Sequence, residues 1–439
     1  MSTKSPDAYF LWELTDPTLP RFVGELRKLS NGDVSLQYDA SWIETGYALS
    51  SDLPLSSTEY PAIFRRMREK AAPGAVDDAR PDNWGEKVIR YLHKPKGNHL
   101  IDYLYFAGTD RFGALGVSSS KAHYEPFPTP AIPRLADAPQ ISEIARIINS
   151  ADGELSEQQR LLASTNASLG GAKPKAVISI GGNEWVLKLY NGETVDLPLV
   201  EHATMTLAKR CGINAAMTMP IRLPGEHAIA IRRFDRMEGR RVHCISAATI
   251  IRSETPSGAS PVFGYPHLAR SIRRMGDAES VKAQLLELFR RMVFNILIAN
   301  TDDHEKNHAF LVRQNGRVPT LSLSPAYDVV PSGNGATHHE FLISEDSAEP
   351  SLSNARSVCA QFDLTDGEAV KVIKLIIAVV DQWQAHFKLH EVTDKDIEEL
   401  VAFIDSDALL AERRNFETTA VTVSPPKPRR GPFGSTASR

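Results

Sequence analysis

The sequence predicts an α+β protein in which a small mixed domain precedes a unit of two lobes, the first built around strands and the second mostly helical. Three observations predict this class. Short strand-like runs and turn formers alternate up to about residue 125, where a proline-rich stretch begins. A glycine-rich segment and several strand patterns then extend to about residue 236. Strong helical periodicity follows from about residue 265 onward.

The first domain is expected over residues 1–125. The stretch FVGELRKLSNGDVSLQYD holds two strand-like runs around the turn formers Asn31 and Gly32. Helical stretches are expected through YPAIFRRMREKA and, after Asp82, through NWGEKVIRYL. The segment HYEPFPTPAIPRLADAP is rich in proline and lacks periodicity, so we expect a linker over residues 126–139.

The first lobe is expected over residues 140–236. It opens with ISEIARIINSADGELSEQQRLLAS, which is apolar at helical spacing, and continues through NASLGGAKPK into the strand candidates AVISIGG and EWVLKLY. The amphipathic stretch LVEHATMTLAKRCGI predicts a helix that stops at Gly212, and IRLPGEHAIAIRRFDR is strand-like again.

The second lobe is expected over residues 237–423. Its strongest helical patterns are VKAQLLELFRRMVFNILIAN and DGEAVKVIKLIIAVVDQWQAHF. Residues 424–439 are basic and rich in proline, so we expect a disordered tail there.

Composition limits the class of function. The chain has 439 residues, of which 42% are hydrophobic and 24% charged, as in ordinary globular proteins. It contains no apolar run long enough to span a bilayer and no secretory signal, so we expect a cytoplasmic protein without membrane contact. Cys211, Cys244 and Cys359 form no paired motif and are expected to be inert thiols. The net charge is −4 although the tail is basic, and an acidic body is a poor candidate for binding DNA by itself.

The segment NTDDHEKNHAF, residues 300–310, can be interpreted in two ways. HEKNH matches the H-E-x-x-H signature of zinc hydrolases, which requires His304 and His308 on one face of a regular helix. The preceding helical pattern ends near Asn300, and a third ligand would have to reach the site across a loop rich in glycine and proline. The zinc interpretation is therefore disfavoured.

The same segment contains D-x-x-x-x-N, from Asp302 to Asn307. Phosphoryl transfer from ATP needs a carboxylate that orients or deprotonates the acceptor hydroxyl, and oxygen ligands for magnesium. Asp302 would supply the carboxylate and Asn307 an amide oxygen, while Asp328, after a predicted strand–turn–strand, would be a second magnesium ligand. The spacing indicates a phosphotransferase that uses ATP and Mg²⁺, with His304 as a structural or orienting residue of the loop.

The rest of a nucleotide site is expected in the first lobe. Lys188 lies in the apolar strand pattern EWVLKLY and needs an anionic partner, because burying an unpaired charge is costly. ATP phosphates and Glu201 on the next helix would serve; the alternative is an edge-strand lysine that reaches water. NASLGGAKPK suits a loop whose backbone N–H groups approach phosphates, and AIAIRRFDR lies where a hinge should hold the adenine.

Together these motifs resemble those of the HipA family of bacterial serine/threonine protein kinases, the toxins of type II toxin–antitoxin modules. FVGELRKLSNG with SSDLPLS is similar to the family's N-terminal domain, and SLGGAKPK to its phosphate loop. NTDDHEKN with YDVVP is similar to its catalytic and magnesium motifs, and the resemblance covers about residues 20 to 410. It implies a protein-kinase-like fold of two lobes behind a small N-terminal domain.

The resemblance also implies roles for single residues. They are Asp302 as catalytic base; Asn307 and Asp328 as magnesium ligands; Lys188 at the ATP phosphates with Glu201; Gly170, Gly171, Ala172 and His304 beside the nucleotide; the backbone from Arg232 to Phe234 at the adenine; and Ser168 as an autophosphorylation site that silences the enzyme. Two departures are visible: Asp303 stands where the family often has glycine, which would add negative charge near the metals, and the basic tail is an addition.

The partners that the resemblance implies are a small helix-turn-helix antitoxin, operator DNA reached through that antitoxin, and a protein substrate of the aminoacyl-tRNA synthetase class. One alternative is a catalytically weak, kinase-like co-repressor that acts with the antitoxin. The presence of Lys188, Asp302, Asn307 and Asp328 speaks against it, because scaffolding alone does not require that set.

Overall fold

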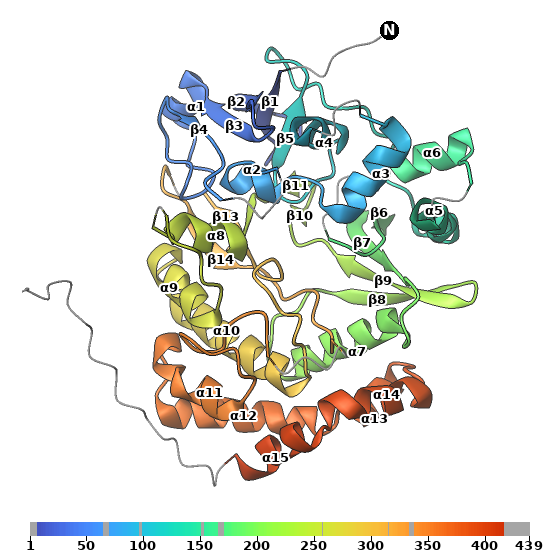
Figure 1. Cartoon of the computed structure of the whole chain (residues 1–439), viewed down its shortest axis with the longest axis vertical. Coiled ribbons are helices and arrows are strands. Elements are labelled where there is room, and N and C mark those ends of the chain that lie inside the picture. The colour runs from blue at the N-terminus through green and yellow to red at the C-terminus, as the bar shows by residue number, and fades with distance from the viewer. Residues whose placement is uncertain are drawn as a thin grey trace, which may run out of the picture.

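The computed structural model describes residues 7–64, 70–95, 99–150, 153–165, 171–256, 258–314, 316–332 and 338–416, and structural statements refer to these. The expected autophosphorylation site Ser168, the loop residue Gly170 and the tail over residues 424–439 lie outside them. So does the middle of YPAIFRRMREKA. The predicted class, α+β with two lobes behind a small mixed domain, is confirmed (Figure 1).

The N-terminal domain is built on an antiparallel sheet of five strands in the order β4-β3-β2-β1-β5. Its elements are β1 Ala8–Glu13, β2 Arg21–Lys28, β3 Val34–Tyr38, β4 Glu59–Tyr60, β5 Leu115–Ser118, α1 Ala40–Thr45, α2 Gly74–Asp78, α3 Asn83–His93 and α4 Leu100–Phe106. The helix expected to begin at Tyr60 is wrong at its start, because Tyr60 pairs with Leu36 as an edge strand. Tyr60 precedes Pro61, and a residue before proline is disfavoured in the helical conformation.

The first lobe contains an antiparallel sheet of four strands in the order β6-β7-β9-β8. Its elements are η1 Leu135–Asp137, α5 Ala138–Ser150, α6 Glu157–Ser164, β6 Lys175–Ile180, β7 Asn183–Leu189, α7 Leu197–Arg210, β8 Thr218–Leu223 and β9 Glu226–Arg232. Gly181 and Gly182 both have positive φ and close the β6–β7 hairpin as a two-residue turn, which fixes its register. Lys175 therefore lies directly opposite Lys188.

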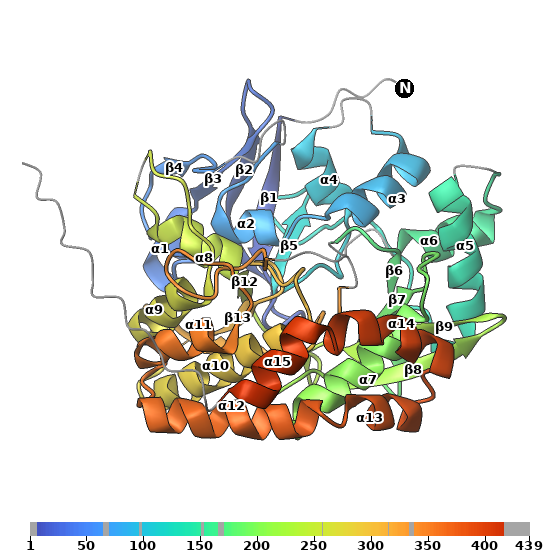
Figure 2. The same ribbon diagram turned by 60° about the horizontal axis from the view of Figure 1, so that its bottom comes forward.

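The second lobe is mostly helical, with a sheet of three strands, β12-β13-β14, beside it. Its elements are β10 Arg236–Met237, β11 Arg240–Arg241, β12 Cys244–Ser246, α8 Ala247–Glu254, α9 Tyr265–Met275, α10 Val281–Leu297, β13 Ala309–Arg313, β14 Thr320–Leu323, α11 Leu352–Ser357, η2 Cys359–Phe362, α12 Asp366–Val380, α13 Trp383–Leu389, α14 Asp394–Ile404 and α15 Asp407–Asn415. Helices α12 and α13 run beneath α10 and α7 (Figure 2). The helix α10 is buried over most of its length and holds the lobe together.

The N-terminal domain and the first lobe share a hydrophobic core. Trp84 and Ile89 of α3 pack in one cluster with Ile144 of α5 and with Ala176 and Ile178 of β6. The proline-rich segment that was expected as a linker also packs, because Phe127 contacts the rings of helices α3 and α4. The N-terminal domain is therefore attached along a broad face.

The three cysteines are buried free thiols, as expected. None of the helices in the described part of the chain combines the length and the apolar character needed to cross a bilayer.

Candidate active site

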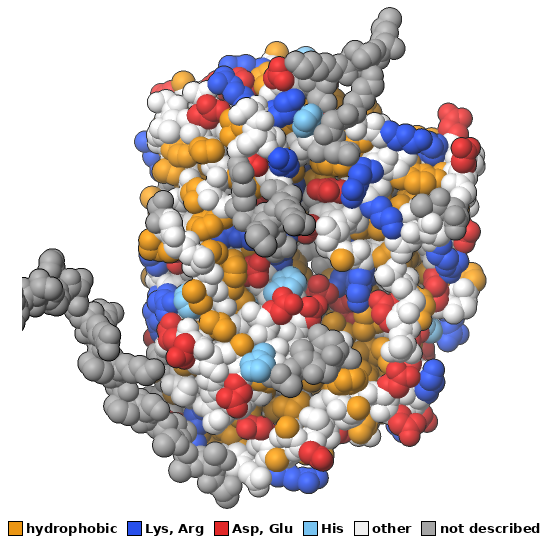
Figure 3. Space-filling model, viewed as in Figure 1, with side chains coloured by type: hydrophobic (Ala, Val, Ile, Leu, Met, Phe, Trp, Pro, Cys, Tyr) orange, Lys and Arg blue, Asp and Glu red, His pale blue; other side chains and the backbone are white. Residues whose placement is uncertain are grey.

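A cleft of about 820 Å³ lies between the two lobes, within the size range of ligand sites. Every predicted site residue in the described part of the chain lines it: Gly171, Ala172, Lys188, Glu201, Arg232, Phe234, Asp302, His304, Asn307 and Asp328. Figure 3 shows acidic, histidine and basic side chains gathered around a hollow near the centre of this face. Residues scattered over more than 150 positions of sequence are thus brought into one site.

The loop that carries Asp302 and Asn307 follows α10 and is a series of turns. Asp302 exposes its side chain to the cleft while its backbone N–H donates to Ser332 Oγ at 3.0 Å. The N–H of Asn307 donates to His304 O at 2.9 Å, and the N–H of Lys306 donates to His304 Nδ1 at 3.1 Å. His304 thus accepts two hydrogen bonds within the loop, one through its carbonyl and one through its imidazole.

The zinc interpretation has no support in this geometry. His304 and His308 do not share a helix, because residues 301–308 contain none. His304 lines the cleft, whereas His308 is buried with its Nε2 3.0 Å from Asp303 Oδ2. The described residues also contain no group of three histidine, cysteine or acidic side chains arranged to hold a metal ion.

Asp303, which was expected to add negative charge near the metals, does not line the cleft. Its carboxylate is buried and accepts a hydrogen bond from Tyr265 Oη at 2.5 Å, besides its contact with His308. Burial raises the pKa of Asp303, but His308 and the Tyr265 hydrogen bond outweigh burial and hold the pKa below its ordinary value. Asp303 thus braces the loop from behind.

Lys188 is the centre of an ion-pair chain. Its Nζ donates to Glu201 Oε1 at 2.7 Å and to Asp328 Oδ1 at 2.5 Å. The side chain is only 14% exposed and β7 is an inner strand, so the alternative of an edge lysine in water is wrong. Burial lowers the pKa of Lys188, but the two carboxylates outweigh burial and hold the pKa above its ordinary value.

Asp328 sits in a strained backbone conformation, with φ of 58°. Its side chain is 45% exposed, toward the cleft. Burial raises the pKa of Asp328, but Lys188 and Lys175 outweigh it and hold the pKa well below the usual range. The carboxylate is therefore ionised at neutral pH, as a ligand for a divalent cation must be.

Lys175 is a site residue that the sequence reasoning missed. It lines the cleft, and no hydrogen bond or ion pair to its ammonium group is present among the described residues. Burial, together with the charge of Lys188, lowers its pKa to about 8. Gly171 has φ of 98°, and a Cβ there would collide with this ammonium. The available signal was the Gly181-Gly182 turn, which places residues 175 and 188 opposite each other.

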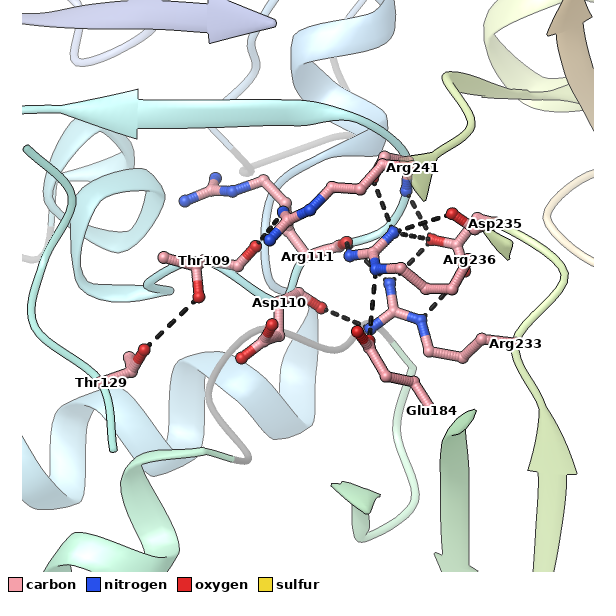
Figure 4. A network of polar contacts seen from close by, with 10 residues as sticks. Thr109, Asp110, Arg111, Thr129, Glu184, Arg233, Asp235, Arg236 and Arg241 are labelled. Atoms are coloured by element: carbon pink, nitrogen blue, oxygen red, sulfur yellow. Dashed lines mark hydrogen bonds and ion pairs between the residues drawn. The ribbon is translucent and has the colours of Figure 1, made fainter. Parts of the chain in front are cut away.

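The expected hinge is held by the N-terminal domain through a buried network (Figure 4). Arg233 donates to both carboxylate oxygens of Asp235, at 2.9 and 2.7 Å, and to the backbone carbonyls of Asp110 and Arg111. Asp235 also accepts from Gly113 N at 2.9 Å. The N-terminal loop thus fixes the backbone on both sides of Phe234.

A lobe of strands with a lysine–glutamate pair, a helical lobe with a D-x-x-x-x-N loop, and an aspartate between them define a kinase-like phosphotransferase class of protein. The chain matches the model of the HipA-like C-terminal domain over residues 167–384 and that of the HipA N-terminal domain over residues 20–118. The chain belongs to the HipA family, whose named members are kinases.

Two curated relatives illustrate the family. The chain is 28% identical over 360 residues to Y4dM, a kinase candidate of Sinorhizobium fredii, covering 77% of this chain and 80% of the relative. It is 23% identical over 336 residues to the serine/threonine-protein kinase toxin HipA of Shewanella oneidensis, covering 70% and 72%. The names of these relatives support the conclusion that this chain is a kinase in the general sense.

Among solved structures, the chain resembles HipA of Shewanella oneidensis MR-1, determined in a complex with HipB and its operator DNA. The TM-score is 0.66 at 17% identity, and the match covers 92% of this chain and 97% of that one. At this identity the similarity confirms the fold.

Proposed function

We propose that this protein is an ATP- and Mg²⁺-dependent serine/threonine protein kinase. One observation carries the proposal: Lys188, with its ion-pair partners Glu201 and Asp328, lines the same cleft as Asp302 and Asn307. A lysine held between two carboxylates beside an exposed aspartate is what phosphoryl transfer from ATP requires.

The nucleotide would lie along the first lobe. Its adenine would stack among Val186, Ile229 and Ile231 and meet the backbone of the hinge from Arg232 to Phe234. Its phosphates would lie against Lys188 and Lys175 and the backbone of Gly171 and Ala172. The ammonium of Lys175 supports this placement, because a buried cation needs an anion and no described residue forms a hydrogen bond or ion pair with it.

The transfer step would use Asp302 as general base. The acceptor hydroxyl oxygen bonds to the γ-phosphorus of ATP, the bond from that phosphorus to the ADP oxygen breaks, and the hydroxyl proton passes to the Asp302 carboxylate. Asn307 and Asp328 suit magnesium because both offer hard oxygen donors and Asp328 stays ionised. Magnesium would neutralise the phosphate charge that develops during transfer.

We further propose that the protein is the toxin of a type II toxin–antitoxin pair. HipA of Shewanella oneidensis supports this role, since it is named a toxin and the similar solved structure is HipA with HipB and its operator DNA. A small helix-turn-helix antitoxin would carry the DNA contact, and the substrate would be an aminoacyl-tRNA synthetase. Ser168, which the family resemblance implies as the autophosphorylation site, would silence the enzyme when phosphorylated, because roughly −1.5 to −2 added charge in the phosphate loop opposes ATP binding.

An assay of phosphate transfer by the Asp302→Asn variant tests the proposal. We expect the variant to bind ATP in the presence of magnesium but to transfer labelled phosphate roughly 10²–10⁴-fold more slowly, both to a protein substrate and to itself. Mapping the wild-type phosphopeptide in the same assay tests Ser168. Equal transfer by the variant contradicts the role of Asp302, and a wild type that binds ATP without transferring phosphate indicates the co-repressor instead.

A further inference from the structure

The first turn of α3, in the N-terminal domain, contacts both lobes of the cleft. The backbone N–H of Trp84 donates to Gly171 O at 3.0 Å, and its indole Nε1–H donates to Lys175 O at 2.9 Å. Two residues earlier, Asp82 accepts a hydrogen bond from Lys306 Nζ at 2.8 Å. One helical turn thus joins the end of the phosphate loop, in the first lobe, to the catalytic loop, in the second.

Lys306 is held at both of its ends. Its ammonium meets Asp82, and its backbone carbonyl accepts from Tyr327 Oη at 2.8 Å. Tyr327 immediately precedes Asp328, and Lys306 immediately precedes Asn307. Lys306 therefore links the catalytic loop to the segment that carries Asp328.

The Asp82–Lys306 pair is sheltered from water. The side chains of Lys306 and Asp82 are 32% and 23% exposed, and both residues line the cleft. Burial raises the pKa of Asp82, but Lys306 outweighs burial and holds the pKa at about 2, so the Asp82 carboxylate is ionised at neutral pH. A partly buried pair is screened by salt less than one on the surface, so it can hold a loop in place.

We propose that Asp82 is a positioning residue for phosphoryl transfer, through which the N-terminal domain holds the catalytic loop against the phosphate loop. The inference rests on the proposed kinase function and gives the N-terminal domain a part in it. A displacement of about 1 Å at a reacting group costs about 10²-fold in rate. The loss should be larger in kcat than in the KM for ATP, because Asp82 contacts Lys306 of the catalytic loop directly and acts on Lys175 only through its charge.

Asp82→Asn isolates the charge. Asparagine caps a helix as well as aspartate, so the cap on Asn83 N is retained while the ion pair is lost. We expect kcat to fall at least about tenfold and the KM for ATP to stay within about twofold. On a Lys306→Met background the same substitution should have no further effect, because the partner is absent.

Arg317→Ala is the matched control. Arg317 donates to the carbonyls of Ile43 and Glu44 at 2.8 and 2.7 Å, so it also joins the N-terminal domain to the second lobe, but outside the cleft. Equal losses in Asp82→Asn and Arg317→Ala, or additive losses in Asp82→Asn and Lys306→Met, overturn the positioning role.

The same assay separates this inference from the proposed function. If the wild type transfers no phosphate and behaves like Asp302→Asn, the kinase function fails and the positioning role fails with it. If the wild type transfers phosphate and Asp82→Asn has unchanged kcat, the positioning role alone is wrong.

Discussion

At the scale of single residues, neighbouring charges keep each ionisable group of the cleft in a defined state. Lys188 stays charged because Glu201 and Asp328 flank it, and Asp328 stays ionised because Lys188 meets it. Lys175 differs, since its pKa of about 8 lies close to neutral pH. Lys175 is therefore a cleft cation whose charge changes between pH 7 and 9.

ATP affinity should accordingly fall as the pH rises from 7 to 9. Below pH 8 Lys175 is mostly charged and attracts phosphate; above it the ammonium loses its proton and the attraction. Calorimetric titration of ATP at pH 7, 8 and 9 measures the change. Lys175→Arg should flatten the profile because arginine stays charged, and Lys175→Met should bind more weakly at pH 7. An equal pH dependence in wild type and Lys175→Arg would rule out Lys175 as its source.

At the scale of elements, α7 links the cleft to the far side of the second lobe. Glu201 on this helix faces Lys188, while its neighbour His202 packs near α13. The ring centroids of His202 and His386 lie 4.9 and 4.5 Å from that of His390. Thr206 Oγ1 contacts both His386 and His390, at 2.9 and 3.2 Å. The imidazoles of His202, His386 and His390 thus form a cluster where α7 packs against α13.

This cluster predicts a loss of stability in acid. Burial lowers the pKa of His202 and of His386 to about 4, from an ordinary 6.5, and nearby positive charges, Lys209 for His202 and Arg210 for His386, oppose protonation further. In the unfolded chain His202 and His386 bind protons as the pH falls below 6.5, whereas in the folded chain they bind protons only near pH 4. Stability present above pH 6.5 is therefore lost between 6.5 and 4.

Thermal unfolding between pH 7.5 and 4.5 measures this loss. A variant with both His202→Gln and His386→Gln should lose less of its Tm over this range than the wild type. His123→Gln is the control, since the His123 side chain is 70% exposed. Parallel Tm profiles for wild type and double variant would contradict the assignment.

At the scale of the whole molecule, the N-terminal domain and the two lobes build one site. The domain contributes the loop that fixes the expected hinge, the turn that contacts Gly171 and Lys306, and part of a shared core. The first lobe is therefore expected to depend on the N-terminal domain for its stability.

Trp84→Ala tests that dependence. Trp84 is 2% exposed in the shared core, and truncation of a buried tryptophan costs about 3–5 kcal/mol. Hydrogen exchange should show reduced protection in α3 and also in β6 and β7. Trp383→Ala, at the start of α13 and in a separate core cluster, should leave β6 and β7 protected. Reduced protection confined to α3 would show that the two parts are independent.

Much of the fold and of the candidate site could be predicted from the sequence. The strand–turn–strand before Asp328 and the helices α7, α10 and α12 lie where periodicity predicted them. The error at Tyr60 arose because a long-range edge pairing outweighed a local helical pattern. The buried position of Asp303 could not be predicted, because adjacent residues of a loop can point to opposite sides, which only the contacts of Asp303 with Tyr265 and His308 reveal.

By itself, the sequence determined the class of fold and predicted a chemistry for the loop, because spacing and periodicity are local properties of the chain. D-x-x-x-x-N from Asp302 to Asn307 indicated phosphoryl transfer without any knowledge of the neighbours. Only the tertiary structure decided that Lys175 joins Lys188 in the cleft and that Asp82 reaches Lys306 across 224 positions. Such contacts depend on packing between distant segments, so no local pattern in the sequence predicts them.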